Sequence, residues 1–413
     1  MAFLIRGRKP LYGTVRAQGA KNAALPILFG CLLSEGPVTL YSLPCIGDVA
    51  VALELLSQMG VAITKTKNDT VTLDAKNAKS PSVALEGCRK IRASSYLLGA
   101  SLSRFGGGSI PYPGGCAFGV RPLNYHKDGF CALGALWEET ATGITVTMAK
   151  PKPASFFLPY PSVGATVNFI LAALGVKGES TLCGYAREQH VLDFIAFLKD
   201  VGAKIEICGN TLHIFGGKPL KGGSFTVPPD AIEAGTYLIA AAATGGEVCV
   251  EGVRYGELSP LLLVFRQMNI PFRFTGDSVT VYQAKSLLGA QVVAAPYPGF
   301  PTDLHPPMTA LLAQAVNGGT VSDLVWGERF SYVEELVKMG ACAHLTPHAV
   351  RVLSSRLHGA HVTAPDLRGG AALVVAGLSA EGETVINGEG CILRGYEALP
   401  QKLFTLGADI ARV

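Results

Sequence analysis

The sequence predicts an α/β protein in which buried helices lie inside and sheets lie outside. Three observations predict this fold: a phrase that recurs about every 70 residues, helices that are apolar on all sides, and short strands of alternating polarity. The six recurrences would form βαβαββ-type units, three in each of two similar domains. The chain has 413 residues, 49% of them hydrophobic, so it can bury a large core.

The recurring phrase is a helix that ends in an aliphatic residue, followed by Gly and a short apolar strand. The residue that follows this helix, Gly or in one case Asn, recurs at intervals of 67 to 74 residues. Such a regular recurrence is hard to obtain by chance. Glycine adopts the left-handed conformation of a helix end readily, and asparagine also tolerates it. We therefore expect left-handed helix ends at Gly60, Gly134, Gly202, Asn269, Gly340 and Gly407.

Each unit also contains an earlier helix rich in Ala and small aliphatic residues, for example at 166–174, 237–243 and 371–377. A helix that is apolar on all sides is typically surrounded by protein rather than lying on a surface. Strands of alternating polarity follow, as at 38–41 and 181–183. These patterns place the helices in the core and the sheets around them.

Polar residues recur where the apolar helices begin. Helix N-termini offer free N–H groups and partial positive charge, so several together would form an anion-binding cleft. Some of these residues can equally be simple N-caps: Ser162, Asp230 and Asp366. A cap does not account for the cations Lys21, Arg92 and Arg368, which are disfavoured at this end of a helix. Cations there indicate an anionic ligand.

The loop from Pro113 to Pro122 carries a thiol, Cys116, and a guanidinium, Arg121. Its glycines and prolines exclude a helix or an interior strand. A flexible loop that presents a thiol beside a permanent cation suits a catalytic lid. A plain surface turn is the competing interpretation, since cysteine is more often a small buried hydrophobe.

Composition excludes several classes of function. The net charge of +4 is small and dispersed, which argues against a nucleic-acid or membrane partner. Ten scattered cysteines without a CxxC pair favour reduced thiols in a cytoplasmic protein over disulfides or a metal site. We expect no signal peptide, no membrane span, no metal and no tightly bound cofactor. The sequence does not indicate an oligomeric state.

Seven motifs occur in order along the chain: residues 19–26, the loop 113–122, residues 162–166, 300–303, 329–330, 366–368 and 394–397. Together they resemble the UDP-N-acetylglucosamine 1-carboxyvinyltransferases, a family of enolpyruvyl transferases. The resemblance implies the fold of EPSP synthase, with two inside-out α/β domains and the active site in the cleft between them. One domain would span 20–228, with the cysteine loop at about 112–122. The other would combine 1–19 with 229–413, so that the first strand joins the C-terminal domain.

The resemblance implies transfer of the enolpyruvyl group of phosphoenolpyruvate to the 3-hydroxyl of UDP-N-acetylglucosamine, with release of phosphate. Lys21 and Arg121 would bind the phosphate, and Arg368 and Arg394 the carboxylate, because a guanidinium matches a planar oxyanion and keeps its charge. Asp303 would accept the hydroxyl proton. Without the resemblance, Asp303 could equally be an ordinary loop carboxylate and Arg394 a solvated charge.

Cys116 matches the lid thiol of the family, which donates a proton, forms an adduct with phosphoenolpyruvate and is alkylated by fosfomycin. A neighbouring arginine favours the thiolate. Asn22 would bind the sugar hydroxyls, and Arg92 with the helix start at Ser162, Val163 and Gly164 would face the diphosphate. The resemblance assigns further substrate contacts to Pro122, Leu123, Asn124, Val325, Arg329 and Asp366. His126 lies near the loop but could equally be a satisfied buried histidine.

Five positions depart from the family pattern, chiefly on the nucleotide-sugar side: Gly47, Asn124, Tyr160, His190 and Leu393. The residues for phosphoenolpyruvate are intact. Two alternatives therefore stay open, a divergent enolpyruvyl transferase with another nucleotide or sugar acceptor, and a non-catalytic paralogue that binds a nucleotide sugar. The related shikimate-pathway enzyme fits less well, because its Gly-Asn-Ala-Gly-Thr stretch is absent.

Overall fold

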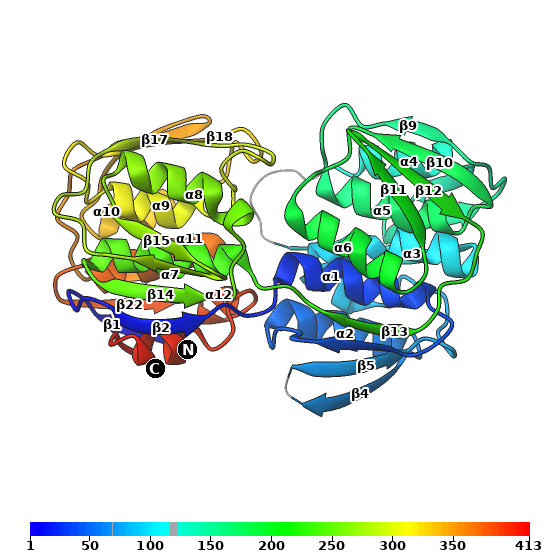
Figure 1. Cartoon of the computed structure of the whole chain (residues 1–413), viewed down its shortest axis with the longest axis horizontal. Coiled ribbons are helices and arrows are strands. Elements are labelled where there is room, and N and C mark those ends of the chain that lie inside the picture. Colours follow the sequence, from blue (N-terminus) through cyan, green and yellow to red (C-terminus); the bar gives the residue numbers. More distant parts are fainter. Residues whose placement is uncertain (68, 116–121) are drawn as a thin grey trace. The chain divides into compact units, whose positions relative to one another are not determined.

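The computed structural model describes residues 1–67, 69–115 and 122–413 of the chain. The described residues form two compact units (Figure 1). Unit 1 contains Met1–Gln18 and Pro229–Val413, and unit 2 contains residues 19–115 and 122–228. The chain thus leaves unit 1 after Gln18 and returns to it at Pro229.

Three buried helices form the centre of each unit. In unit 1 they are α7 (Ala231–Thr244), α9 (His305–Leu312) and α11 (Leu367–Ser379), which pack on one another. In unit 2 they are α1 (Lys21–Gly30), α3 (Tyr96–Phe105) and α5 (Val163–Leu174). From Ala165 to Leu174 every residue of α5 is buried, as the all-round apolar sequence predicts.

Three four-stranded sheets surround the helices of unit 1, with β1 and β2 in blue in Figure 1. The first has the order β21 (His361–Thr363), β22 (Glu383–Asn387), β1 (Ala2–Arg6), β23 (Asp409–Arg412). The second has the order β15 (Phe272–Thr275), β16 (Ser278–Val281), β14 (Glu247–Glu251), β2 (Tyr12–Arg16). The third has the order β17 (Ala290–Ala294), β18 (Gly319–Asp323), β20 (Ala349–Leu353), β19 (Cys342–Thr346). The first strand of the chain therefore pairs with strands close to its C-terminus.

Unit 2 has two four-stranded sheets and one three-stranded sheet among its described residues. The first has the order β11 (Lys204–Cys208), β12 (Thr211–Gly216), β10 (Gly178–Cys183), β9 (Ser155–Phe157). The second has the order β13 (Gly223–Thr226), β3 (Val38–Tyr41), β5 (Thr70–Asp74), β4 (Ala62–Lys67). The third has the order β6 (Gly107–Pro111), β8 (Gly143–Met148), β7 (Ala135–Glu139).

The strand pairing repeats from sheet to sheet. In all five four-stranded sheets of the described chain, one edge strand pairs parallel and the other neighbours pair antiparallel. A parallel neighbour requires a crossover connection. In three of these sheets a buried helix supplies it, since α5 joins β9 to β10, α9 joins β17 to β18 and α11 joins β21 to β22. The predicted architecture of buried helices and outer sheets is confirmed.

A second helix precedes each of the six expected left-handed helix ends. These helices are α2 (Gly47–Gln58), α4 (Asn124–Ala132), α6 (Gln189–Asp200), α8 (Tyr255–Gln267), α10 (Tyr332–Lys338) and α13 (Leu399–Thr405). The φ angles that follow lie between 58° at Asn269 and 103° at Gly202. All six expected positions have this left-handed conformation. The repeat predicted from the sequence is therefore present in the backbone itself.

Among the described residues, no helix is long and apolar enough to span a bilayer.

Candidate active site

In unit 1, the carboxylate of Asp303 lies between two buried guanidinium groups. Arg329 Nη1 donates to Asp303 Oδ1 at 2.7 Å. Arg368 donates to Asp303 Oδ2 from Nε at 3.1 Å and from Nη2 at 3.0 Å. The side chains of Arg329 and Arg368 are 4% and 1% exposed, whereas that of Asp303 is 22% exposed. The charged cluster therefore reaches the surface through the carboxylate.

The start of α11 places Arg368 in this cluster. Asp366 is the N-cap of α11, and its Oδ1 accepts from the backbone N–H groups of Arg368 at 2.9 Å and Gly369 at 3.1 Å. Arg368 is the second residue of the helix, so its cation stands at the end where the helix dipole disfavours it. Its Nη1 is buried and has no hydrogen-bond partner among the described residues. A buried guanidinium with an unused N–H donor can bind an anionic ligand.

Tyr396 packs on the other side of Arg368. The Arg368 guanidinium carbon lies 5.2 Å from the centre of the Tyr396 ring, a cation–π contact. The Tyr396 hydroxyl lies 2.9 Å from Thr236 Oγ1 on α7. Burial alone would lower the pKa of Arg368, but the Asp303 carboxylate together with Tyr396 and Asp230 outweighs burial and raises that pKa above the ordinary value. Arg368 is therefore a fixed, permanent cation.

A second layer of polar groups supports Asp303 from the side of α9. Thr302 Oγ1 donates to Asp323 Oδ2 at 2.6 Å, and His305 Nε2 lies 3.1 Å from the same oxygen. Asp323 Oδ1 accepts from the backbone N–H of Val325 at 2.7 Å. Burial would raise the pKa of Asp323, but the neighbouring His305 and the hydrogen bond from Thr302 outweigh burial and lower that pKa. Asp323 thus fixes the loops that carry Asp303 and Val325.

Arg394 follows the short helix α12 (Glu389–Ile392) and is half-buried in the turn before Tyr396. The structure thus brings four predicted residues of unit 1 into direct contact: Asp303, Arg329, Asp366 and Arg368. Val325 belongs to the loop held by Asp323.

In unit 2, Lys21 is the first residue of α1 and is paired with a carboxylate. Its Nζ lies 3.0 Å from Asp48 Oδ2 in the first turn of α2, and the two side chains are 13% and 6% exposed. Burial makes this pair tighter than a surface salt bridge, because little solvent screens it. Asn22 is half-buried beside Lys21.

The start of α5 is capped as the sequence predicts, since Ser162 Oγ accepts from the N–H of Ala165 at 3.3 Å. Gly164 lies against the ring of His126, so a Cβ atom there would be 3.0 Å from His126 Cε1. His126 Nδ1 lies 2.8 Å from Asn168 Nδ2 on α5. Burial and, to a lesser extent, Arg92 lower the pKa of His126 to about 3. His126 is thus a buried, neutral histidine, which agrees with the interpretation of His126 as a satisfied buried histidine.

Other predicted residues of unit 2 flank this region. Arg92 begins a 3-10 turn, η3 (Arg92–Ser95), directly before α3, and Val163 is the first residue of α5. Pro122 and Asn124 are exposed, with Leu123 half-buried at the N-cap of α4. Cys116 and Arg121 lie outside the described residues.

The five departures from the family pattern occupy helix ends and loops. Gly47 and His190 lie in the first turns of α2 and α6. Asn124 begins α4, Tyr160 lies two residues before the cap of α5, and Leu393 ends α12.

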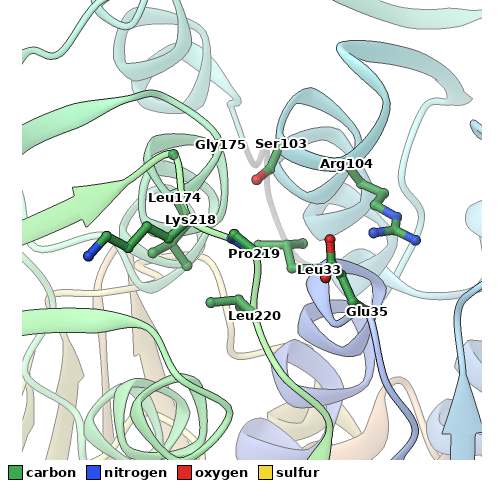
Figure 2. A pocket seen from close by; sticks show the side chains of 10 residues that line it. Leu33, Glu35, Ser103, Arg104, Leu174, Gly175, Lys218, Pro219 and Leu220 are labelled. Carbon is green, nitrogen blue, oxygen red and sulfur yellow. The ribbon is translucent and has the colours of Figure 1, made fainter.

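Unit 2 also has a hollow of about 230 Å³ (Figure 2). It lies at the carboxyl ends of the core helices, where Leu33, Arg104 and Leu174 line it. The predicted site residues start the same helices, about 18 Å away along the 12 residues of α5. The side chains of Arg104 and Lys218 extend in opposite directions from the hollow. This hollow is therefore not the candidate active site.

Comparisons with known proteins agree with this geometry. The profile of the EPSP synthase (3-phosphoshikimate 1-carboxyvinyltransferase) family matches residues 5–403. A protein of Halothermothrix orenii named UDP-N-acetylglucosamine 1-carboxyvinyltransferase is 40% identical over 412 residues, which is 100% of this chain and 99% of that protein. A protein of Clostridium botulinum with the same name is 41% identical, with 99% of each chain covered. This chain belongs to the UDP-N-acetylglucosamine 1-carboxyvinyltransferase family.

Solved structures of related enzymes have the same fold. The enolpyruvyl transferase NikO of Streptomyces tendae aligns with a TM-score of 0.90 and 26% identity, covering 100% of this chain and 98% of that chain. EPSP synthase of Acinetobacter baumannii aligns with a TM-score of 0.78 and 20% identity over the whole of both chains. At that identity the second likeness shows the fold alone. The chain is therefore a carboxyvinyltransferase with the two-domain fold expected from its sequence.

The structure adds residues that the sequence analysis missed. Asp48 pairs with Lys21, Tyr396 packs on Arg368, and Asp323 holds Thr302 beside Asp303. Asp48 stands in the first turn of a helix, where a carboxylate is common, so nothing local distinguished it. Tyr396 lies inside the motif at 394–397, but its partner Arg368 lies outside that motif.

Proposed function

We propose that this carboxyvinyltransferase moves the enolpyruvyl group of phosphoenolpyruvate to the 3-hydroxyl of UDP-N-acetylglucosamine and releases phosphate. This is the first committed step of peptidoglycan precursor synthesis, and we place it in the cytoplasm. The observation that carries the proposal is the Asp303 carboxylate between the guanidiniums of Arg329 and Arg368, in a chain 40% identical to proteins of that name.

The reaction requires one proton to be delivered to the methylene carbon of phosphoenolpyruvate and one to be removed from the sugar hydroxyl. The hydroxyl oxygen then bonds to the central carbon. Loss of a methyl proton and of inorganic phosphate restores the double bond, so the atoms balance. In the proposal Cys116 donates the first proton, and Asp303 removes the hydroxyl proton.

The cations of both units take part in the proposed reaction. Lys21 and Arg121 would bind the phosphate, and Arg368 and Arg394 the carboxylate, so that fixed positive charge meets the charge that develops in the transition state. Arg368 Nη1, buried without a partner among the described residues, supports its assignment to the carboxylate. We propose that the domain at 20–228 and the domain formed by 1–19 and 229–413 each contribute groups to the active site.

The acceptor would be bound largely by unit 2. The N-terminus of α5 offers free N–H groups after Ser162, which suits a diphosphate. Arg92 would add a cation and Asn22 would bind the sugar hydroxyls. The remaining substrate contacts would come from Pro122, Leu123, Asn124, Val163, Gly164, Val325, Arg329 and Asp366.

A phosphate-release assay tests the proposal. The purified chain with phosphoenolpyruvate and UDP-N-acetylglucosamine should release one phosphate per enolpyruvyl product. The five departures favour a second candidate, the same transfer to another nucleotide or sugar. Release only with another acceptor would replace the leading proposal by this one. Absence of release with every acceptor would favour a non-catalytic binder.

Fosfomycin gives an independent test of the Cys116 assignment. We expect one covalent addition at Cys116, faster when the sugar nucleotide is present, because substrate closure gathers cations around the thiol. Intact-mass spectra and peptide mapping measure the addition. An unmodified protein, or labelling of an exposed thiol such as Cys45 or Cys131 instead, would contradict it.

A further inference from the structure

Gln18 uses every polar group it has to join three parts of unit 1. Its backbone N–H donates to Glu233 Oε2 at 2.6 Å, and its carbonyl accepts from the N–H of Asp230 at 2.7 Å. Its side-chain Nε2 donates to the carbonyl of Gly395 at 3.0 Å, and its Oε1 accepts from the N–H of Glu397 at 2.6 Å. Gln18 is 6% exposed, so water competes little for these bonds.

The side-chain amide of Gln18 therefore holds the two peptide groups on either side of Tyr396. One is the carbonyl that precedes Tyr396 and the other is the N–H that follows it. A single amide that donates to one peptide and accepts from the next fixes both the position and the rotation of the backbone between them. Tyr396 is held at both peptide bonds by one side chain.

The segment fixed in this way adjoins two groups of the proposed carboxylate site, Arg394 and Arg368. Arg394 precedes it directly. The Tyr396 ring packs against the Arg368 guanidinium, and its hydroxyl lies 2.9 Å from Thr236 Oγ1 on α7. Because the ring limits where Arg368 can lie, a shift of the backbone at 395–397 would move both guanidiniums.

Glu233 anchors Gln18 from the opposite side. Glu233 is fully buried, and its Oε1 accepts from Lys402 Nζ at 2.8 Å and from the Tyr237 hydroxyl at 3.1 Å. A buried carboxylate with partners on both oxygens is stable only in a fixed geometry. Gln18 is thus fixed at its backbone by α7 and acts at its side chain on the 395–397 segment.

We propose that Gln18 is a positioning residue that sets Arg394 and Arg368 for binding the carboxylate of phosphoenolpyruvate. The proposal rests on the proposed function. Gln18 touches neither substrate nor reacting atoms in this assignment, and it acts through the backbone around Tyr396. Loss of the Gln18 side chain should therefore weaken the binding of phosphoenolpyruvate more than it slows turnover of the bound complex.

Gln18→Met tests the proposal, because methionine keeps the volume and removes both side-chain hydrogen bonds. We expect the KM for phosphoenolpyruvate to rise about tenfold or more, with kcat within about threefold and the KM for the acceptor unchanged, since two buried hydrogen bonds are lost. Gln18→Glu keeps the acceptor for Glu397 and loses the donor to Gly395. Its KM for phosphoenolpyruvate should therefore lie between that of the parent chain and that of Gln18→Met.

Thr244→Val is the matched control. Thr244 ends α7 about 21 Å from Asp230 along the helix, and its Oγ1 accepts from the N–H of Leu11 in the same N-terminal segment. This variant loses a similar bond far from residues 395–397, so its kinetics should match the parent chain. Amide exchange of the peptide around 394–398 should quicken in Gln18→Met and stay unchanged in Thr244→Val.

The outcomes distinguish failure of the proposed function from failure of the positioning role of Gln18. If the parent chain releases no phosphate with any acceptor, the proposed function fails and this inference fails with it. If the parent chain is active and Gln18→Met keeps its KM for phosphoenolpyruvate, the positioning role alone is wrong. An equal rise in KM for both substrates, or the same rise in Thr244→Val, would also overturn it.

Discussion

Arg368 donates two hydrogen bonds to a single oxygen of Asp303, from Nε at 3.1 Å and from Nη2 at 3.0 Å. Arg368, the proposed ligand of the phosphoenolpyruvate carboxylate, is therefore also the partner of Asp303, the proposed base. In the proposed reaction the carboxylate of phosphoenolpyruvate would compete with Asp303 for Arg368.

This competition predicts the effect of Asp303→Asn. We expect kcat to fall by about two to four orders of magnitude, because the general base is lost. The affinity for phosphoenolpyruvate should stay unchanged or increase, since Asn competes less than Asp for Arg368. Phosphate release measures the first effect and calorimetric titration the second. Asp277→Asn, at an exposed position of the same unit, is the control. Weaker binding in Asp303→Asn would contradict the competition.

The geometry of the guanidinium predicts the effect of Arg368→Lys. Arg368 uses its planar fork toward Asp303 and its flat face toward Tyr396, and an ammonium reproduces neither. We expect the KM for phosphoenolpyruvate to rise at least about 100-fold, which is about 2.7 kcal/mol. Arg351→Lys on the exposed face of β20 should change nothing. A KM close to that of the parent would exclude Arg368 from the carboxylate site.

The repeat was predictable because its signals are local. Gly60, Gly134 and Asn269 report their own backbone conformation, and all have positive φ angles in the structure. The caps at Ser162, Asp230 and Asp366 bond to N–H groups two or three residues ahead. A pattern of residue types is sufficient wherever the interacting groups are neighbours in sequence.

The partners of the site residues could not be predicted in the same way. Arg368 and Asp303 are 65 residues apart, and Gln18 and Glu397 are 379 apart. Such pairs depend on how the helices pack, which local patterns of residue types do not specify. The resemblance identified Asp303 and Arg368 as site residues, but only the fold shows that they bond to each other.

The buried Lys21–Asp48 pair predicts non-additive effects of substitution. Either Lys21→Met or Asp48→Asn removes one half of this buried ion pair, at a cost of about 3 kcal/mol in stability. The double variant should regain most of that stability, while phosphate release stays low because Lys21 is absent. Urea unfolding midpoints and the phosphate assay measure the two effects. Additive stability losses would show that the two residues act independently.

The buried neutral His126 predicts a dependence of stability on pH. Its pKa is about 3 in the folded chain and 6.5 as an ordinary value. Below pH 6.5 the unfolded chain therefore takes up a proton that the folded chain refuses, so stability falls as the pH falls toward 3. Each pH unit in this window removes about 1.4 kcal/mol, or about 2 kcal/mol between pH 6.5 and pH 5.

Substituting His126→Gln isolates this contribution, because glutamine can still bond to Asn168 and does not titrate. The parent chain should lose more stability than His126→Gln between pH 7.5 and pH 5, measured as the shift of the urea midpoint at each pH. Other groups titrate in both proteins, so their effects cancel in the comparison. Equal shifts in the two proteins would mean that His126 takes up its proton in the folded chain. In that case the contact of His126 with Gly164 and Asn168 must open at low pH, and the start of α5 would be acid-sensitive.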